Sequence, residues 1–290
     1  MIGVDWGTTS IRAYRFDGPA VRDRLERPGG ILQVPPGDFP AALRDVVGPW
    51  LQDGERRVLL SGMVGSRQGW IEAPYLPCPA DTRSLASALV AVPFDNATVL
   101  LVPGLTATAG EVPEVMRGEE VQILGALDQI GPDGVACLPG SHSKWARLRA
   151  GRVDGFTTHM TGEAFAALRD HTILGRLMDA DAPHDRDAFG QGVARSAEPG
   201  GLLHHLFGVR TLGLFGRLPP GAAASYLSGL VIGHEVRAAA PGAVTTLIGA
   251  GPLCALYAVA IGMVGGRAVL ADTDAAARGL ATIGEHAAWT

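Results

Sequence analysis

The 290-residue sequence has few cysteines, a single lysine and no large excess of either charge. Its three cysteines, Cys78, Cys137 and Cys254, are widely spaced and form no CxxC pair, so neither a disulfide framework nor a zinc site is expected. The 24 basic and 29 acidic residues give a net charge of −5. This balance lacks the basic surface that non-specific nucleic-acid binding requires, so we expect no nucleic-acid partner.

The sequence also lacks a recognisable targeting or membrane segment. No basic region followed by an apolar segment and a small-residue cleavage site precedes the first strand-like run, so we expect a cytoplasmic protein. The long uncharged stretch between Arg237 and Arg267 is divided by glycines and prolines. It predicts a buried strand, a glycine turn and an apolar helix, and we expect no membrane partner.

What is present is ordinary globular composition, with 47% apolar and 18% charged residues. At about 150 residues per domain, the length suggests two domains. Strand-like runs (57–60, 98–102, 135–138, 244–248 and 268–271) alternate with helical patterns (41–51, 119–127, 223–239 and from 273), which predicts an α/β fold. The small residues of 103–113 read as a loop, so we place a boundary there: one lobe over 1–112, and another over 113–290 whose terminal helix can pack back on the first.

Each half begins with a strand that runs into a glycine- and hydroxyl-rich turn. In the first turn Asp5 precedes Gly7, Thr8, Thr9 and Ser10. This could be a simple hairpin turn, but its N–H groups and hydroxyls suit phosphate oxygens, and the carboxylate suits Mg²⁺. No GxxxxGK[ST] sequence occurs, which excludes a P-loop site.

The second turn comprises Gly140, Ser141, His142, Ser143 and Lys144. Lys144 is the only lysine among 24 basic residues, and lysine is a compact charge commonly used to bind phosphate or carboxylate. Lys144 could be only a surface cation, but we predict that this turn also binds phosphate.

A third glycine turn, Gly249-Ala250-Gly251, lies between a predicted strand and helix. With Asp272 further on it resembles a dinucleotide fingerprint, but Cys254 stands at the third glycine position and too little chain follows to complete such a domain. A turn that carries adenosine explains the same residues.

Several polar residues remain with two readings each. Glu119 and Glu120 are either favourable charges at a helix N-terminus or include a general base, and the sequence does not separate the two. Two arginines and two aromatic residues either have no function at the surface or bind an anionic sugar: Arg67, Trp70, Tyr75 and Arg117. The eight histidines show no metal-binding spacing.

The order of these motifs resembles the superfamily of sugar kinases, actin and heat-shock ATPases. Within it, the segments LSGMVGSRQGW (60–70), MRGEE (116–120), LPGSHSKW (138–145) and MTGE (160–163) are similar to the 2-dehydro-3-deoxygalactonokinase family. The similarity covers nearly the whole chain.

This resemblance implies an α/β protein with two ribonuclease-H-like lobes and an interdomain nucleotide cleft. It implies transfer of the γ-phosphoryl group of ATP to the terminal (6-) hydroxyl of 2-dehydro-3-deoxy-D-galactonate, with Mg²⁺ held by Asp5. By the same resemblance Glu163 joins the substrate residues. The larger sugar kinases carry an aspartate base where this chain has Gly118-Glu119-Glu120, so the identity of the base stays open.

Two other functions remain open on the sequence. The chain could phosphorylate a related keto-deoxy sugar acid such as the gluconate epimer, since epimers differ by one hydroxyl orientation. It could also be a catalytically inactive sensor that binds sugar acid and nucleotide. The oligomeric state is open as well, because the apolar residues of 202–207 fit either a core or a subunit interface.

Overall fold

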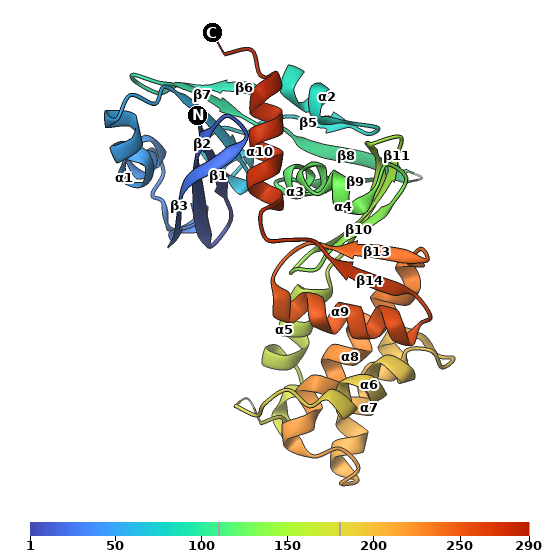
Figure 1. Cartoon of the computed structure of the whole chain (residues 1–290). Helices are drawn as coiled ribbons and strands as arrows, with labels where there is room; N and C mark the ends of the chain where they lie inside the picture. The colour runs from blue at the N-terminus through green and yellow to red at the C-terminus, as the bar shows by residue number, and fades with distance from the viewer. Residues whose placement is uncertain (110, 180, 290) are drawn as a thin grey trace. The chain divides into compact units, whose positions relative to one another are not determined.

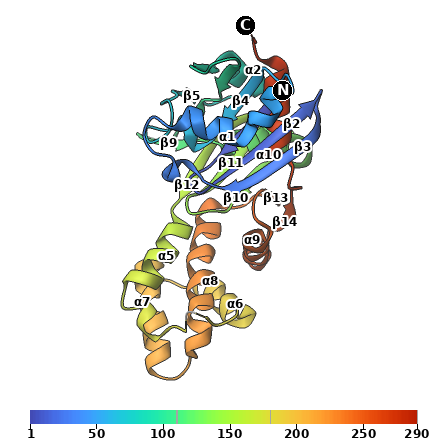
Figure 2. The ribbon, with the colours of Figure 1, turned by 90° about the vertical axis from the view of Figure 1, so that its left-hand side faces the viewer.

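The computed structural model describes residues 1–109, 111–179 and 181–289, and the chain divides into two compact units (Figures 1 and 2). The first unit comprises Met1–Asp133, Arg147–Phe156 and Asp272–Thr290, and the second comprises Gly134–Ala146 and Thr157–Ala271. The predicted boundary between residues 112 and 113 falls inside the first unit. The reason is that β9 (Val112–Met116) pairs with β8 (Gly104–Ala109) of the same unit.

The first unit is built on a six-stranded sheet of order β3-β2-β1-β4-β7-β6. Its strands are β1 (Ile2–Trp6), β2 (Ser10–Asp17), β3 (Ala20–Pro28), β4 (Arg57–Ser61), β6 (Val90–Val92) and β7 (Thr98–Leu101). β1 pairs antiparallel with β2 and parallel with β4, and β4 pairs parallel with β7. The carboxyl ends of β1, β4 and β7 therefore reach the same edge.

Helices cover both faces of this sheet because side chains alternate along β1. Ile2 and Val4 share one buried cluster with Leu43 of α1 (Phe39–Gln52). Gly3 points the other way, and an ideal Cβ built on it lies 3.1 Å from the Leu280 side chain of α10 (Ala275–His286). Figure 1 shows α10, in red, beside the blue N-terminal strands. The terminal helix thus belongs to the first unit.

A second sheet has the order β12-β11-β10-β13-β14. Its strands are β10 (Val135–Leu138), β11 (Ser143–Arg149), β12 (Arg152–His159), β13 (Val244–Leu247) and β14 (Arg267–Leu270). β10 is parallel to β13, and β13 is parallel to β14. In both sheets, therefore, the first four strands along the chain lie in the order third, second, first, fourth. The predicted α/β fold class is confirmed.

The helices of the second unit pack mainly on α8 (Pro220–Ala239). They are α5 (Thr161–His171), α6 (Arg186–Arg195), α7 (Gly201–Leu214) and α9 (Gly251–Met263), with the short η3 (Gly175–Leu177). Figure 2 shows α5 and α7 alongside α8. The α6–α8 crossing is close: an ideal Cβ on Gly192 would lie 2.2 Å from the Tyr226 carbonyl oxygen, and one on Gly229 would lie 2.0 Å from that of Phe189. Only glycine fits at such contacts.

The expectation of a loop over 103–113 is wrong. β8 and β9 form a hairpin, and with β5 (Tyr75–Pro77) they make a third sheet of order β5-β8-β9. The charged strand β3 was also not predicted, because an exposed strand carries no apolar alternation. The remaining short elements are η1 (Ile31–Gln33), η2 (Met63–Gly65), α2 (Thr82–Ser87), α3 (Glu119–Gly125) and α4 (Leu127–Ile130). Among the described residues, no helix is both long and apolar enough to cross a membrane.

Candidate active site

Three loops of the first unit meet beside Asp5, near the end of β1. Gly62 follows β4 with φ of +92°, and its ideal Cβ would lie 3.2 Å from Asp5 Oδ1 and 2.7 Å from the Trp6 carbonyl oxygen. Gly118, with φ of +104°, precedes α3, and its ideal Cβ would lie 3.1 Å from Gly62 Cα. Both positions favour glycine because the backbone is left-handed and the space is filled. These contacts bring the start of α3 to Asp5.

The surroundings of Asp5 carry excess negative charge. Its side chain is 14% exposed, and the nearest cation, Arg12, has Nη1 3.7 Å from Oδ2. Burial raises the pKa of Asp5 to about 6, Arg12 opposes this, and the carboxylates of Glu119 and Glu26 raise it further. A partly buried carboxylate in such surroundings is stabilised by a bound cation.

The two adjacent glutamates are separated by their surroundings. Glu120 is fully buried, and its carboxylate oxygens lie 2.7 and 2.9 Å from the Gly118 nitrogen, whose N–H donates to them. Burial, and then Glu119, raise the pKa of Glu120 well above its usual range. Glu119 is partly exposed, and its Oε2 accepts a hydrogen bond from the Arg117 nitrogen at 2.9 Å. Glu120 therefore holds the turn, whereas Glu119 is partly exposed beside it.

Of the five predicted sugar-acid residues, the structure brings Arg117 and Tyr75 together. Arg117 is 7% exposed, donates from Nη2 to the Ala73 carbonyl oxygen at 2.7 Å, and lies 4.4 Å above the Tyr75 ring. Its buried Nε and Nη1 have no hydrogen-bond partner among the described residues. A buried guanidinium with unused donors is suited to an anion.

The fifth predicted residue, Glu163, belongs to the second unit, and the side chains of Arg67 and Trp70 make other contacts. Arg67 is 86% exposed and pairs with Glu72 at 3.4 Å. Trp70 stacks on Phe39 with ring centroids 6.3 Å apart and packs against the core of the first unit.

The two threonines of the first glycine turn are exposed. The Gly7 nitrogen donates to the Ser10 carbonyl oxygen at 2.9 Å, which closes the turn, and Thr8 and Thr9 are exposed. Gly30 packs behind them, since its ideal Cβ would lie 2.2 Å from the Thr8 carbonyl. The exposed Thr8 and Thr9 of the turn can therefore be reached by an anion.

In the second unit the turn after β10 is held by the start of α5. An ideal Cβ on Gly162 would lie 2.5 Å from the Gly140 carbonyl oxygen, and the Glu163 nitrogen donates to the Ser141 carbonyl oxygen at 3.1 Å. Ser141 and His142 are exposed, and His142 Nε2 bonds to Glu163 Oε2. Ser143 and Lys144 are instead buried at the start of β11, a strand that the sequence did not predict.

The third glycine turn lies against the second. The Ile248 nitrogen donates to the Cys137 carbonyl oxygen at 3.0 Å, and an ideal Cβ on Gly249 would lie 3.7 Å from the Pro139 carbonyl oxygen. Gly249, Ala250 and Gly251 are exposed at the start of α9.

The contacts of Asp272 do not support a dinucleotide-binding site. Its carboxylate oxygens lie 2.7 and 2.8 Å from Arg278 Nη1, and one of them accepts a hydrogen bond from Gln129 Nε2 at 3.1 Å. These contacts give Asp272 a structural role in the first unit.

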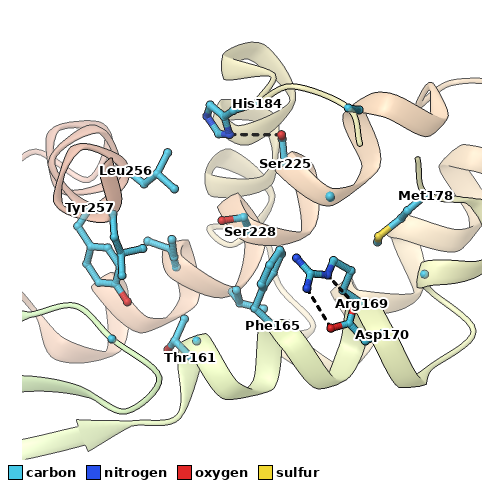
Figure 3. A pocket seen from close by; sticks show the side chains of 18 of the residues that line it. Thr161, Phe165, Arg169, Asp170, Met178, His184, Ser225, Ser228, Leu256 and Tyr257 are labelled. Atoms are coloured by element: carbon cyan, nitrogen blue, oxygen red, sulfur yellow. Dashed lines mark hydrogen bonds and ion pairs between the residues drawn. The ribbon is translucent and has the colours of Figure 1, made fainter. Parts of the chain in front are cut away.

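A cavity of about 410 Å³ opens beside Gly140 between α5, α8 and α9 (Figure 3). Its walls are mainly apolar, with Phe165, Met178 and Leu256 among them, and its polar groups include the Arg169–Asp170 pair and His184, which contacts Ser225 Oγ at 3.3 Å. Such a mixture is typical of small-molecule sites. Sequence reasoning missed this cavity, because its residues come from helices that only the fold brings together.

Among the residues that the structure describes, protein groups alone form no metal cage. Within the part of the chain that the structure describes, no group of three or more His, Cys, Asp or Glu side chains converges on one point. Mg²⁺ commonly takes one or two carboxylates plus water and substrate phosphates, so Asp5 with an open side fits this ion.

Comparisons with known proteins agree with the motifs. The family model for 2-keto-3-deoxy-galactonokinase matches residues 5–283. A protein of Rhizobium meliloti named as a probable 2-dehydro-3-deoxygalactonokinase is 35% identical over 99% of this chain and 96% of its own. The 2-dehydro-3-deoxygalactonokinase of Escherichia coli is 35% identical over 81% of this chain and 78% of its own.

Solved structures agree as well. A crystal structure from Sinorhizobium meliloti, provisionally described as a 2-dehydro-3-deoxygalactonokinase, has a TM-score of 0.90 at 33% identity and covers 98% of this chain and 97% of its own. A Clostridium difficile activator of 2-hydroxyisocaproyl-CoA dehydratase shares the fold, with a TM-score of 0.52 at 12% identity over 98% and 94% of the two chains. The predicted resemblance is confirmed: the chain belongs to the 2-keto-3-deoxy-galactonokinase family.

Proposed function

We propose that this protein transfers the γ-phosphoryl group of ATP to the terminal (6-) hydroxyl of 2-dehydro-3-deoxy-D-galactonate. The carrying observation is the meeting of Asp5 and the Glu119 turn at one sheet edge, fixed by Gly62 and Gly118. Phosphoryl transfer depends mainly on positioning and charge neutralisation, which such an arrangement can supply. The names of the relatives support the choice of sugar acid.

For the nucleotide, we assign the nucleoside to the cavity beside Gly140 and the phosphates to the Ser141-His142 turn at its edge. The paired His142 and Glu163 side chains are available to orient them. Thr8 and Thr9 of the first unit are phosphate-binding residues in this proposal.

Asp5 holds Mg²⁺ in this proposal, since its partly buried carboxylate faces one cation, Arg12 at 3.7 Å, and the carboxylates of Glu119 and Glu26. When bound, the ion neutralises charge on the β- and γ-phosphates. Glu119 accepts the proton from the sugar hydroxyl, because it is partly exposed and electrostatically coupled to Asp5, whereas Glu120 is buried under the Gly118 turn. A weak base suffices when the proton leaves late.

Arg117 recognises the carboxylate of the sugar acid, with Tyr75 beneath the guanidinium. A planar guanidinium binds a carboxylate through paired hydrogen bonds, and two of its buried nitrogens have no partner in the described residues. We assign no direct contact to Arg67, because its guanidinium pairs with Glu72, or to Trp70, because it packs against the core of the first unit.

The test is coupled ADP release with Mg-ATP and four acceptors: 2-dehydro-3-deoxygalactonate, its gluconate epimer, galactonate and a neutral sugar. We expect turnover of the keto-deoxy acids only, with the galactonate form preferred. Arg117→Met should raise KM for the acid at least tenfold, and Glu119→Gln should lower kcat far more than Glu120→Gln. ATP binding without any ADP release would favour the inactive sensor instead.

A further inference from the structure

A buried chain of hydrogen bonds runs from the second glycine turn into the core of the second unit. Ser143 Oγ lies 3.4 Å from the Gly140 nitrogen and 2.8 Å from the Tyr257 hydroxyl of α9. That hydroxyl donates to Glu235 Oε2 of α8 at 2.6 Å. Trp145 Nε1 donates to the other carboxylate oxygen at 2.7 Å. All four side chains are buried.

The chain has a defined direction. An indole N–H only donates and a carboxylate only accepts, so both Glu235 oxygens are acceptors. Burial, and then the Glu235 carboxylate, raise the pKa of Tyr257 well above its usual range. The Tyr257 hydroxyl therefore stays protonated and donates a hydrogen bond to Glu235. Ser143 must then donate to the Tyr257 oxygen, which leaves the Ser143 oxygen to accept from the Gly140 N–H.

The chain links the two parts of the nucleotide site. Tyr257 lies on α9, which begins at the Gly249 turn, and it also lines the cavity beside Gly140 (Figure 3). A side chain that touches the cavity and is bonded to the turn can fix the distance between them. The 2.8 Å bond between Ser143 and Tyr257 ties the last residue of the turn to the core, and the 3.4 Å contacts of Ser143 with Gly140 extend this link across the turn.

We propose that Tyr257 and Glu235 are positioning residues for the nucleotide, which hold the Gly140–Ser143 turn in register with the nucleoside cavity; this inference rests on the proposed function. Tyr257→Phe removes one oxygen, keeps the shape of the ring and breaks the link between turn and core. Glu235→Gln keeps the link. The new amide oxygen accepts from Trp145, and the new amide N–H donates to the Tyr257 oxygen. The Tyr257 hydroxyl then donates to Ser143, and the Ser143 hydroxyl donates to the Gly140 carbonyl oxygen.

The experiment measures Mg-ADP affinity by calorimetry, together with KM for Mg-ATP and for the sugar acid. We expect about tenfold weaker Mg-ADP binding for Tyr257→Phe, with a matching rise in KM for Mg-ATP, no change in KM for the acid, and near wild-type values for Glu235→Gln. Tyr226→Phe is the matched control, since this buried tyrosine of α8 has its hydroxyl near Gly208 of α7 and away from the turn.

Several outcomes overturn the inference. Tyr257→Phe binding within twofold of wild type would do so, as would equal losses in Glu235→Gln and Tyr257→Phe. If Tyr257→Phe does not fold, Ser143→Ala breaks the link from the other end and must show the same tenfold loss. Wild-type protein that binds no Mg-ADP and phosphorylates no acceptor would refute the proposed function first, and the inference with it.

Discussion

Replacing Asp5 with asparagine should stabilise the folded protein at neutral pH while abolishing kinase activity. The carboxylate lies in a partly buried place, 3.7 Å from the Arg12 guanidinium and under the influence of Glu119 and Glu26. Asparagine has the same shape and no charge, so it removes the cost of burying the charge and also the ligand proposed for Mg²⁺. Residues chosen for function commonly cost stability in this way.

The magnitude follows from the pKa. Asp5 titrates near 6 in the folded protein instead of 3.8, and each pH unit of difference corresponds to about 1.4 kcal/mol, so the ionised group costs at most about 3 kcal/mol. For an acid with a raised folded pKa, this cost is absent below the unfolded value and complete above the folded one. The advantage of Asp5→Asn should therefore be full above about pH 6 and should vanish as the pH falls to about 4.

Urea unfolding of wild type and Asp5→Asn between pH 4 and 8, followed by circular dichroism, measures this difference. Asp45→Asn is the matched control, because Asp45 is well exposed and its only described ion pair is a 3.7 Å contact with Arg27. A gain in stability that stays constant with pH, or a loss at pH 8, would refute the reasoning about burial. Retained ADP release in Asp5→Asn would refute the metal assignment separately.

Three glycine substitutions and one control substitution test the close contacts. Gly229→Ala should lower the free energy of unfolding by about 3 kcal/mol in urea titrations, since its Cβ would meet the Phe189 carbonyl oxygen at 2.0 Å, while Gly208→Ala, with 3.9 Å of space, should not destabilise. Gly162→Ala should raise KM for Mg-ATP about tenfold without changing KM for the acid, because the new Cβ would lie 2.5 Å from the Gly140 carbonyl oxygen and would displace the turn. An unchanged KM for Mg-ATP would mean that the turn is not part of the site. Gly118→Ala should cost about 1–2 kcal/mol through its positive φ and lower kcat by displacing the base; full activity would contradict the role of this turn.

Local features of the fold could be predicted because their causes lie close together in the sequence. The hairpin that carries Asp5 and the strand–turn–helix around Gly249 show alternation and glycine turns within a few residues. The hairpin of 104–116 could not, because its small alternating residues bury little by themselves. Its pairing with β5, more than 25 residues earlier in the chain, supplies the missing partner.

The candidate site was predictable in its parts and not in their arrangement. The motif around Gly62 was visible in the sequence. The contacts of Gly62 with Asp5 and Gly118 were not, because they join three segments that are distant in the chain. The roles of Glu119 and Glu120 depend on which one the fold buries, a property that two identical neighbouring side chains do not reveal. Trp70 similarly is a residue type that often binds sugars, but here its side chain packs against the core of the first unit.

The return of α10 to the first unit has a consequence for synthesis on the ribosome. Helix α3, which begins at the candidate base, packs on α10 so closely that an ideal Cβ on Gly125 would lie 1.9 Å from the Ala275 carbonyl oxygen. Translation proceeds at about 5–20 residues per second, so the early strands wait on the order of ten seconds for this helix. During that interval the apolar face later covered by α10 is open to chaperones, and phosphoryl transfer can begin only when nearly the entire chain has emerged.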